Sequence, residues 1–506
     1  DHSTMWYALA QFARPGLTRN HFTSTVDVSN IEDYTRAILA GRRRGADGVA
    51  MHDHGVYVAP RESRHIVGEI ALTLTDQMRR RRWPDVVNVA FSNHDVKGHT
   101  GSDWLRIGLI PPNLEIEIPY RALLPAGLDG LLVVGKALSA DHDALPAIRM
   151  QADLENLGGA AALAAAQSVQ TGQPLKGLDI RQLQARLVQE SILPPDVLTR
   201  TLMPLRVDAD ALRAQITALP DDKPLYAYSD MELSDIYVDL IPLVEVCCAG
   251  PEVVPLLEAA LDDASGARAV LLAQALALVG SARGVPVLLD AVAPHLAGDR
   301  LPARTAHIRY TQLPPDHGAM PDVVYLLYSL GMAPDARALP VWVRVVDLLA
   351  HVGESDFYEQ MPGAFYYVDV VGFAAERLAL PALIPTLKAL HAHPALHGKH
   401  SAGGFQPDYV QERLAYLEVV IGRALARCGS ADGFTLLITY LTDSRALLAE
   451  QAHSELVAIT GEDHGKDVQR WGEWLEQHAD DLRPSPWRHV SDAVRAWQDA
   501  SETLRV

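Results

Sequence analysis

Hydrophobic and polar positions alternate differently in the two parts of the chain. Before about residue 178, short apolar runs are separated by polar turns. Their length and β-branched content are typical of strands at 56–59, 65–74, 86–91 and 114–118. In the last of these runs, Leu114, Ile116 and Ile118 alternate with two glutamates, which predicts one buried face and one wet face. Since a helix is also expected after an N-cap at Ser29 or Asn30, the pattern favours an α+β domain over residues 1–178.

A distinctive stretch lies near the end of this domain. The apolar run 131–134 ends at Gly135, and a Gly/Ala-rich segment that reaches Ala166 follows after a polar turn. A strand, a turn and a helix in this order form the layout in which a nucleotide lies over a helix N-terminus. The stretch therefore predicts part of a nucleotide-binding site.

The remainder of the chain has the spacing of helices. After a helical connector over 179–231, apolar helices joined by short turns follow in pairs over 232–482. This repetition is typical of HEAT-like repeats, which stack into an α-solenoid with an extended surface for a partner. A C-terminal helix or tail is expected over 483–506.

Composition and charge narrow the class of protein. The 506 residues include 63 acidic and 44 basic side chains, a formal charge of −19, which argues against general binding to nucleic acid. No apolar run is long enough for a membrane span, and the three cysteines lack a metal-site or disulfide spacing. These features do not decide whether the protein is located in the cytoplasm, in the periplasm or outside the cell.

Four ordered motifs carry a family resemblance: "DVSNIEDYTRAILAGRRR" at 27–44, "PRESRHIVGE" at 60–69, "LTLTD" at 72–76 and "IPYRALLPAGLDGLLVVGKALSADHDALPAIRM" at 118–150. Together with the Gly/Ala helix, they resemble the C-terminal half of FAD-dependent oxidoreductases with two dinucleotide-binding domains. The resemblance covers roughly residues 1–190 and implies FAD as cofactor. It also implies a substrate-binding sheet together with the last strand and helix of an FAD domain.

The phosphate-binding fingerprint of that family is missing from the sequence. No GxGxxG occurs in the 506 residues, although FAD pyrophosphate needs such a loop at a helix N-terminus. The chain also opens on an apolar segment, with Met5 to Phe12 inside it. We therefore expect a partner polypeptide, either a second subunit or the other product of a cleaved precursor, to carry the GxGxxG half.

The resemblance implies a set of cofactor-binding residues around the distinctive stretch, with the helix opening at 147–150. The set comprises Gly135, Lys136, His142, Ala147, Ile148, Arg149 and Met150. A helix N-terminus with Arg149 beside it suits the negative charge that a reduced flavin develops. A surface salt bridge is the alternative role for Arg149.

Oxidation by a flavin also needs a group that accepts a proton, and histidine is the usual one. The candidates are His142, His94 and His54, with His52 and His99 as neighbours in "MHDHG" and "NHDVKGH". Capping of turns or a shared metal ion are alternatives for the loop histidines, although no metal site is assigned.

Other charged segments have a simpler interpretation. Arg79–Arg82 are expected at a solvated helix end. Residues 61–64 are expected to form a charge-paired segment that braces the sheet against the flavin domain, with a direct substrate contact as the alternative. Two hypotheses for function follow. In the first, the chain belongs to a two-chain FAD oxidoreductase acting on a small molecule, with a further copy of the chain as a possible partner. In the second, the flavin half is degenerate and the solenoid is a non-catalytic scaffold.

Overall fold

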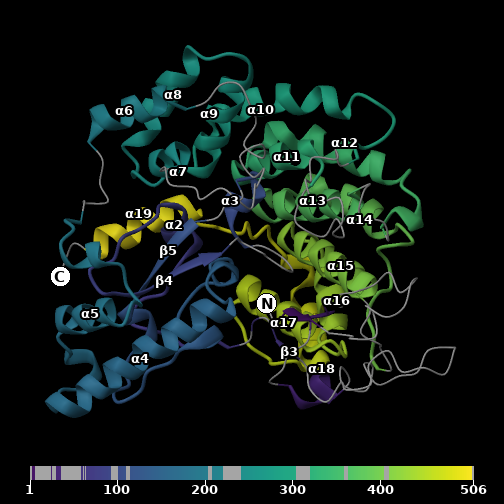
Figure 1. Ribbon diagram of the computed structural model, residues 1–506. Coiled ribbons are helices and arrows are strands. Elements are labelled where there is room, and N and C mark those ends of the chain that lie inside the picture. Colours follow the sequence, from purple (N-terminus) through teal and green to yellow (C-terminus); the bar gives the residue numbers. More distant parts are fainter. Residues whose placement is uncertain are drawn as a thin grey trace, which may run out of the picture. The chain divides into compact units, whose positions relative to one another are not determined.

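The computed structural model describes thirteen parts of the chain: 3–5, 24–25, 30–35, 59–60, 62, 64–92, 101–109, 114–202, 208–219, 241–303, 320–357, 363–403 and 409–503. The chain divides into two compact units, which are described separately. One, the mixed unit, comprises Glu62–Ser281, Ile308–Thr311 and Val490–Val506. The other, the helical unit, comprises Asp1–Arg61, Ala282–His307 and Gln312–His489. Figure 1 labels their helices and strands.

An antiparallel strand pair is the centre of the mixed unit. Strand β4 (Val86–Ser92) pairs with β5 (Leu114–Pro119), with Ala90 opposite Ile116. Both runs were predicted as strands, and the apolar face of β5 is buried as expected. The opposite face is dry at Glu117, which is only 2% exposed, whereas the side chain of Glu115 is 37% exposed. Arginines from elsewhere in the unit cover this carboxylate.

Two other predicted strands of this unit are wrong. Residues 65–73 are irregular and meet other segments through two isolated bridges, Gly68 with Pro125 and Leu72 with Ala140. Helix α2 (Leu74–Met78) then begins, with Thr73 and Asp76 forming a capping box. Residues 131–134 are likewise outside any strand. A β-strand needs a neighbour with which to exchange hydrogen bonds, and the described residues offer no strand beside either segment.

The Gly/Ala-rich segment forms the predicted helix. Helix α4 (Gln151–Thr171) ends at Gly172, whose φ of 68° provides the left-handed C-terminal cap. It packs on β4, and α5 (Ile180–Gln189) packs on both. Buried Leu157, Ala160 and Ala164 belong to the core that these elements share. Small side chains on this face allow the helix to approach the strands closely.

Short helices complete the mixed unit: α3 (Asp103–Arg106), α6 (Ala209–Thr217), α7 (Pro242–Cys247), α8 (Val253–Asp262), α9 (Gly266–Leu278) and α19 (Asp492–Thr503). The C-terminal helix α19 packs against α2, α7 and α9. Asp492 accepts hydrogen bonds from the Asp103 N–H at 2.9 Å and the Ser102 hydroxyl at 2.8 Å, and the Asp492 N–H donates to Asp103 at 3.3 Å. The two aspartates therefore cap each other's helices.

The helical unit confirms that the C-terminal part of the chain is helical. Its helices are α10 (Val285–Val292), α11 (Asp322–Met332), α12 (Leu339–Leu349), α13 (Ala364–Leu378), α14 (Ile384–His391), α15 (Tyr409–Arg427), α16 (Ala431–Tyr440), α17 (Ala446–Thr460) and α18 (Val468–His478). Along the chain, α11 packs on α13, α13 on α15 and α12 on α14. Such alternation suits stacked helix pairs, and HEAT-like repeats stay a prediction.

The same unit includes a small sheet. Strand β1 (Ser3–Met5) lies between β2 (Ser24–Thr25) and β3 (Ala59–Pro60), which holds the end of the run predicted at 56–59. The Asn30 side chain accepts hydrogen bonds from the N–H groups of Glu32 and Asp33, which confirms it as an N-cap.

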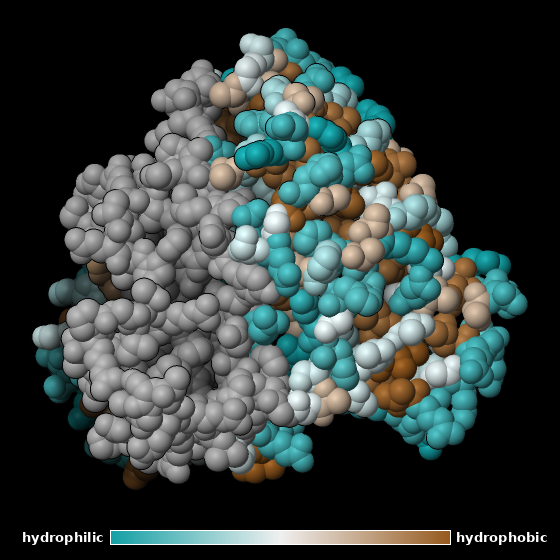
Figure 2. All heavy atoms as spheres, turned by 90° about the vertical axis from the view of Figure 1, so that its right-hand side faces the viewer, coloured by the Kyte–Doolittle hydropathy of each residue, from teal (hydrophilic) through white to brown (hydrophobic). Residues whose placement is uncertain are grey.

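Figure 2 shows one face of the molecule, on which hydrophilic side chains of the described residues are interspersed with apolar ones. Among the described helices, none combines the length and the apolar character that a membrane crossing requires.

Candidate functional site

The predicted cofactor-binding residues form the approach to α4 rather than its first turn. Gly135 begins a short 3-10 turn, Gly135–Ala137, and another 3-10 turn spans Leu145–Ala147. Met150 is the N-cap residue of α4, so residues 147–150 precede the helix and do not open it as expected. Pro146 is accommodated in the second turn, because the N–H that it lacks would be unpaired at the start of a turn.

These residues divide into buried and accessible ones. Ala147 and Ile148 are fully buried in the core, which leaves their side chains no route to a bound molecule. Lys136 is exposed, and Arg149 and Met150 are partly exposed. The turn that contains Lys136 packs on α4.

Two backbone features of this region suit an anionic or planar group. The N-cap residue Met150 makes no side-chain capping hydrogen bond, so it leaves the first N–H groups of α4 and the positive end of the helix dipole without this cap. Gly135 has a φ of 76°, and apart from its two chain neighbours no heavy atom of a described residue lies within 4 Å of the place where a Cβ would stand. A side chain at this position would be strained and would occupy open space beside the backbone.

His142 is held by a buried carboxylate from a distant part of the sequence. Its Nδ1 hydrogen-bonds to Oε2 of Glu62, whose side chain is 5% exposed, whereas the His142 side chain is 19% exposed. Oε1 of the same glutamate hydrogen-bonds to Nε2 of His65 at 3.1 Å. The other nitrogen of His65 lies 3.1 Å from the backbone carbonyl of Leu138. Glu62 therefore bridges two imidazoles.

The bridge shifts the pKa values of all three groups. Burial alone would raise the pKa of Glu62, but the hydrogen bonds from His142 and His65 outweigh it and lower that pKa to about 2. Burial lowers the pKa of His142, while its hydrogen bond to Glu62 and the charge of Asp143 produce a net rise. The hydrogen bond to Glu62 also raises the pKa of His65. The bridge therefore favours imidazolium in both histidines.

The turn around His142 is fixed by the two aspartates beside it. Asp141 accepts hydrogen bonds from the backbone N–H of Ala144 at 2.6 Å and of Leu74 at 3.3 Å. The buried carboxylate of Asp143 accepts from the N–H groups of Gly101 and Ser102 at 2.9 and 2.8 Å. These bonds orient the imidazole without using its nitrogens.

Sequence reasoning missed Glu62 and His65 as members of this cluster. Their i, i+3 spacing in "ESRH" was the available signal, and the expected ion pairing of the segment is formed with histidines. Of the predicted catalytic residues, the structure places His142 in the cluster. His54 and His94, together with His52 and His99, lie outside the described residues.

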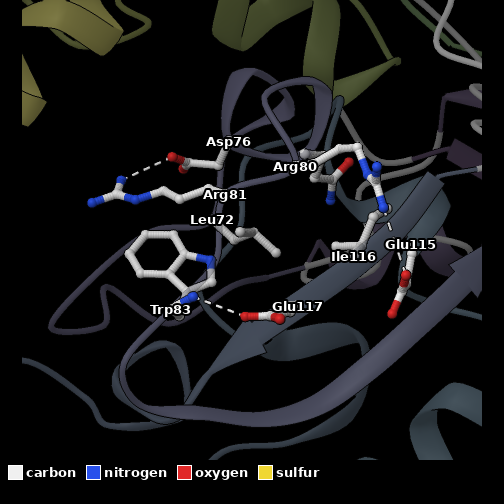
Figure 3. Close-up of a pocket in the computed structure, with 9 residues that line it drawn as sticks. Leu72, Asp76, Arg80, Arg81, Trp83, Glu115, Ile116 and Glu117 are labelled. Carbon is white, nitrogen blue, oxygen red and sulfur yellow. Dashed lines mark hydrogen bonds and ion pairs between the residues drawn. The ribbon is translucent and has the colours of Figure 1, made fainter. Parts of the chain in front are cut away.

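The arginine run after α2 is not a solvated helix end. Arg79 is buried and makes a bidentate pair with Glu245, at 3.2 Å from Nε and 3.0 Å from Nη2. Arg81 pairs with Asp76 at 2.9 Å and lies over the Trp83 ring (Figure 3). The charged side chains that line the pocket in Figure 3 already have ion-pair partners, and we assign no ligand to it.

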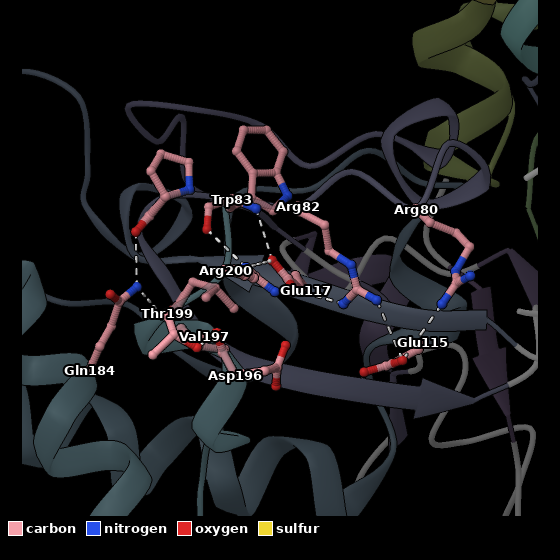
Figure 4. A network of polar contacts seen from close by, with 12 residues as sticks. Arg80, Arg82, Trp83, Glu115, Glu117, Gln184, Asp196, Val197, Thr199 and Arg200 are labelled. Atoms are coloured by element: carbon pink, nitrogen blue, oxygen red, sulfur yellow. Dashed lines mark hydrogen bonds and ion pairs between the residues drawn. The ribbon is translucent and has the colours of Figure 1, made fainter. Parts of the chain in front are cut away.

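Glu117 is the main acceptor for the basic side chains around β5. It accepts hydrogen bonds from Arg82 at 2.8 Å, the Trp83 N–H at 2.8 Å and Nη2 of Arg200 at 2.7 Å, and Nη1 of Arg200 contacts it as well (Figure 4). Figure 4 also shows Arg80 and Arg82 pointing toward Glu115. The arginines therefore lie over β5 as structural counter-ions, which explains why the face of Glu117 is dry.

Comparison with known proteins supports the resemblance. Residues 10–187 match the family model of the FAD-dependent oxidoreductases. No curated protein and no solved structure matches the chain significantly. The match implies FAD as the cofactor and favours a flavoprotein oxidoreductase.

The residues present fit one end of FAD. The uncapped start of α4, the open backbone at Gly135, and the basic Lys136 and Arg149 suit the polar edge of a flavin ring. The sequence has no phosphate-binding GxGxxG loop for the other end.

Proposed function

We propose that the chain is a subunit or processed chain of a two-chain FAD-dependent oxidoreductase. It oxidises a small organic substrate by hydride transfer to the flavin, and a partner polypeptide supplies the FAD pyrophosphate loop. One observation carries the proposal: the family match spans residues 10–187, while no GxGxxG occurs in the 506 residues. FAD binding needs a phosphate-binding loop as well, and we propose that the partner polypeptide carries it.

Exposed apolar residues near the predicted nucleotide stretch support a partner. Val67 is 81% exposed, Leu128 52%, Leu131 44% and Val134 36%, all within the mixed unit. Within the part of the chain that the structure describes, segment 131–134 makes one backbone hydrogen bond outside helices and strands, from the Val133 N–H to the Leu123 carbonyl at 2.9 Å. Apolar side chains beside a segment with open hydrogen-bonding positions favour addition of a strand from another polypeptide.

The chain's own residues have separable tasks in this proposal. FAD, when bound, accepts two electrons from a C–H bond of the substrate. Arg149 and the α4 N-terminus place positive charge where the flavin becomes negative. Lys136 adds to this field from the neighbouring turn.

The Glu62 bridge provides for the proton that leaves the substrate's O–H or N–H group. Because Glu62 holds Nδ1 of His142, proton exchange with the substrate would use Nε2, which is buried in this structure and has to become accessible. In its neutral form His142 accepts this proton, and the Glu62 carboxylate stabilises the imidazolium that results. The raised pKa of His142 makes it a stronger base, at the cost of a smaller neutral fraction near pH 7.

Purification of the tagged chain from its native source tests the proposal. We expect a yellow complex with flavin absorbance bands and a second polypeptide that contains GxGxxG. Leu131→Asp should release that polypeptide, whereas Leu198→Asp, at an apolar residue 37% exposed in the same unit, should retain it. A colourless preparation that contains this chain alone would refute the two-chain flavoprotein and favour the scaffold.

A further inference from the structure

A second cluster of potential ligands lies in the helical unit, at the C-terminal end of α14. His391 is the last residue of α14, His397 follows in the connection, and Glu418 lies on α15. Each offers one ligand atom, and these atoms all lie within 4.8 Å of one another. Nε2 of His391 is 2.9 Å from Oε1 of Glu418, and the ring centroids of His391 and His397 are 4.8 Å apart, with 65° between the ring planes.

Glu418 is held rigidly in this cluster. Its side chain is 2% exposed, and Oε1 also accepts a hydrogen bond from the Gly398 N–H at 2.7 Å. Oε2 accepts from the Lys399 N–H at 2.6 Å and from the Tyr440 hydroxyl at 2.7 Å. These three donors from outside the site favour the carboxylate form, which ligates metals, and fix its orientation.

We propose that His391, His397 and Glu418 form a site for a zinc-type divalent ion. Two imidazoles and one carboxylate are a donor set that zinc uses when one coordination position stays open. Imidazole nitrogen disfavours magnesium and calcium, which prefer oxygen. This site is separate from the Glu62 bridge and does not depend on the proposed flavin chemistry.

The geometry requires only a small adjustment. Ligand atoms on a tetrahedral zinc ion stand about 3.3 Å apart, since each is about 2.0–2.1 Å from the metal. The pair of His391 and Glu418, now at 2.9 Å, has to open by a few tenths of an ångström. The ion takes the place of the proton between the two atoms, and this proton goes to solvent. His397 is exposed and therefore free to turn its ring toward the ion.

Neighbouring histidines have other partners. Nε2 of His393 lies 3.0 Å from the Val352 carbonyl, and its Nδ1 accepts from the Ala395 N–H at 3.1 Å. Nε2 of His400 lies 3.2 Å from the Thr442 hydroxyl. His400 is therefore the matched control, because it belongs to the same histidine-rich segment without joining the cluster.

Zinc titration of the full-length chain tests the site. After removal of metals with a chelator, calorimetry with zinc chloride and elemental analysis should give one ion per chain. His397→Ala and His391→Ala should each weaken binding at least about tenfold, whereas His400→Gln should match the unmodified chain. The exposed position of His397 makes its variant safe for folding, which circular dichroism verifies. Substoichiometric zinc, or equal affinity in the His397 variant and the unmodified chain, would overturn the proposal.

Discussion

The bridge between Glu62 and two histidines makes a sharp prediction for Glu62→Gln. The amide keeps the shape of the side chain but removes the charge that favours imidazolium in His142 and His65. The segments around 62–68 and 139–145, which the bridge joins, should open more readily. The effect should depend on pH, because the attraction exists only while the carboxylate is ionised and the imidazoles are protonated.

The shifted pKa values give the magnitude and the pH window. A fall of the Glu62 pKa from 4.5 to about 2 corresponds to about 3 kcal/mol, at about 1.4 kcal/mol per pH unit. This stabilisation is present above pH 4.5 and is lost as the pH falls toward 2. The histidine contribution has the opposite sign: it is complete below pH 6.5 and is lost as the pH rises through the raised pKa of His142. The variant should therefore lose most between about pH 4.5 and 6.5.

Hydrogen exchange measured peptide by peptide detects this local opening, because it reports on the segments of the mixed unit separately from the helical unit. At each pH, the variant and the unmodified chain are compared directly, so the intrinsic exchange rates cancel. About 3 kcal/mol predicts exchange roughly a hundredfold faster near pH 5.5 and a smaller ratio near pH 8.5. Glu69→Gln is the control, because Glu69 pairs with Lys176 at a partly exposed site and should cost less than about 1 kcal/mol. A ratio that is constant with pH, or largest at pH 8.5, would refute the bridge.

Three further predictions concern packing, buried charge and the cofactor site. In α13, Gly372→Ala would place a Cβ 2.1 Å from a valine side chain and should lower the free energy of thermal unfolding by about 1–3 kcal/mol. The control is Gly472→Ala in α18, which has no described atom within 4 Å of the new Cβ and should be neutral or stabilising. The reverse order of stabilities would contradict the helix packing. Glu117→Gln leaves Arg200 without its buried counter-ion and should lower the free energy of unfolding, measured in urea, by about 3 kcal/mol. A loss below about 1 kcal/mol would show that the Arg200 charge is solvated. Arg149→Ala should slow flavin reduction in the complex without changing the helical circular dichroism; unchanged turnover would remove Arg149 from the site.

Local signals in the sequence correctly predicted the elements that depend on capping residues and on hydrophobic periodicity. Asn30 caps its helix, the Gly/Ala-rich segment forms α4, and the runs at 86–91 and 114–118 pair as strands. In each of these, the deciding interactions are close in sequence or follow from hydrophobic periodicity. The same signals identified the turn that contains His142.

Partners that are distant in sequence explain the errors. Glu245, which neutralises Arg79, lies 166 residues away along the chain, and Glu62 lies 80 residues from His142. Neither pairing has a periodic signal, so a solvated helix end was the simpler expectation for the arginines. The runs at 65–74 and 131–134 have strand composition, but strand formation depends on a neighbour that composition does not specify.

The wrong strand prediction at 131–134 has a connection to the proposed function, because this segment has no neighbouring strand among the described residues. Strand-forming residues that find no partner strand in the described part of the chain are expected where a sheet is completed by another polypeptide. Completion there would cover Leu131 and Val134, which are 44% and 36% exposed, next to the open backbone at Gly135. If the proposed partner supplies both this strand and the pyrophosphate loop, assembly and flavin binding would be coupled. Bound flavin should accordingly raise the affinity of the two polypeptides for each other. Association of the two polypeptides should raise the affinity for flavin by the same factor.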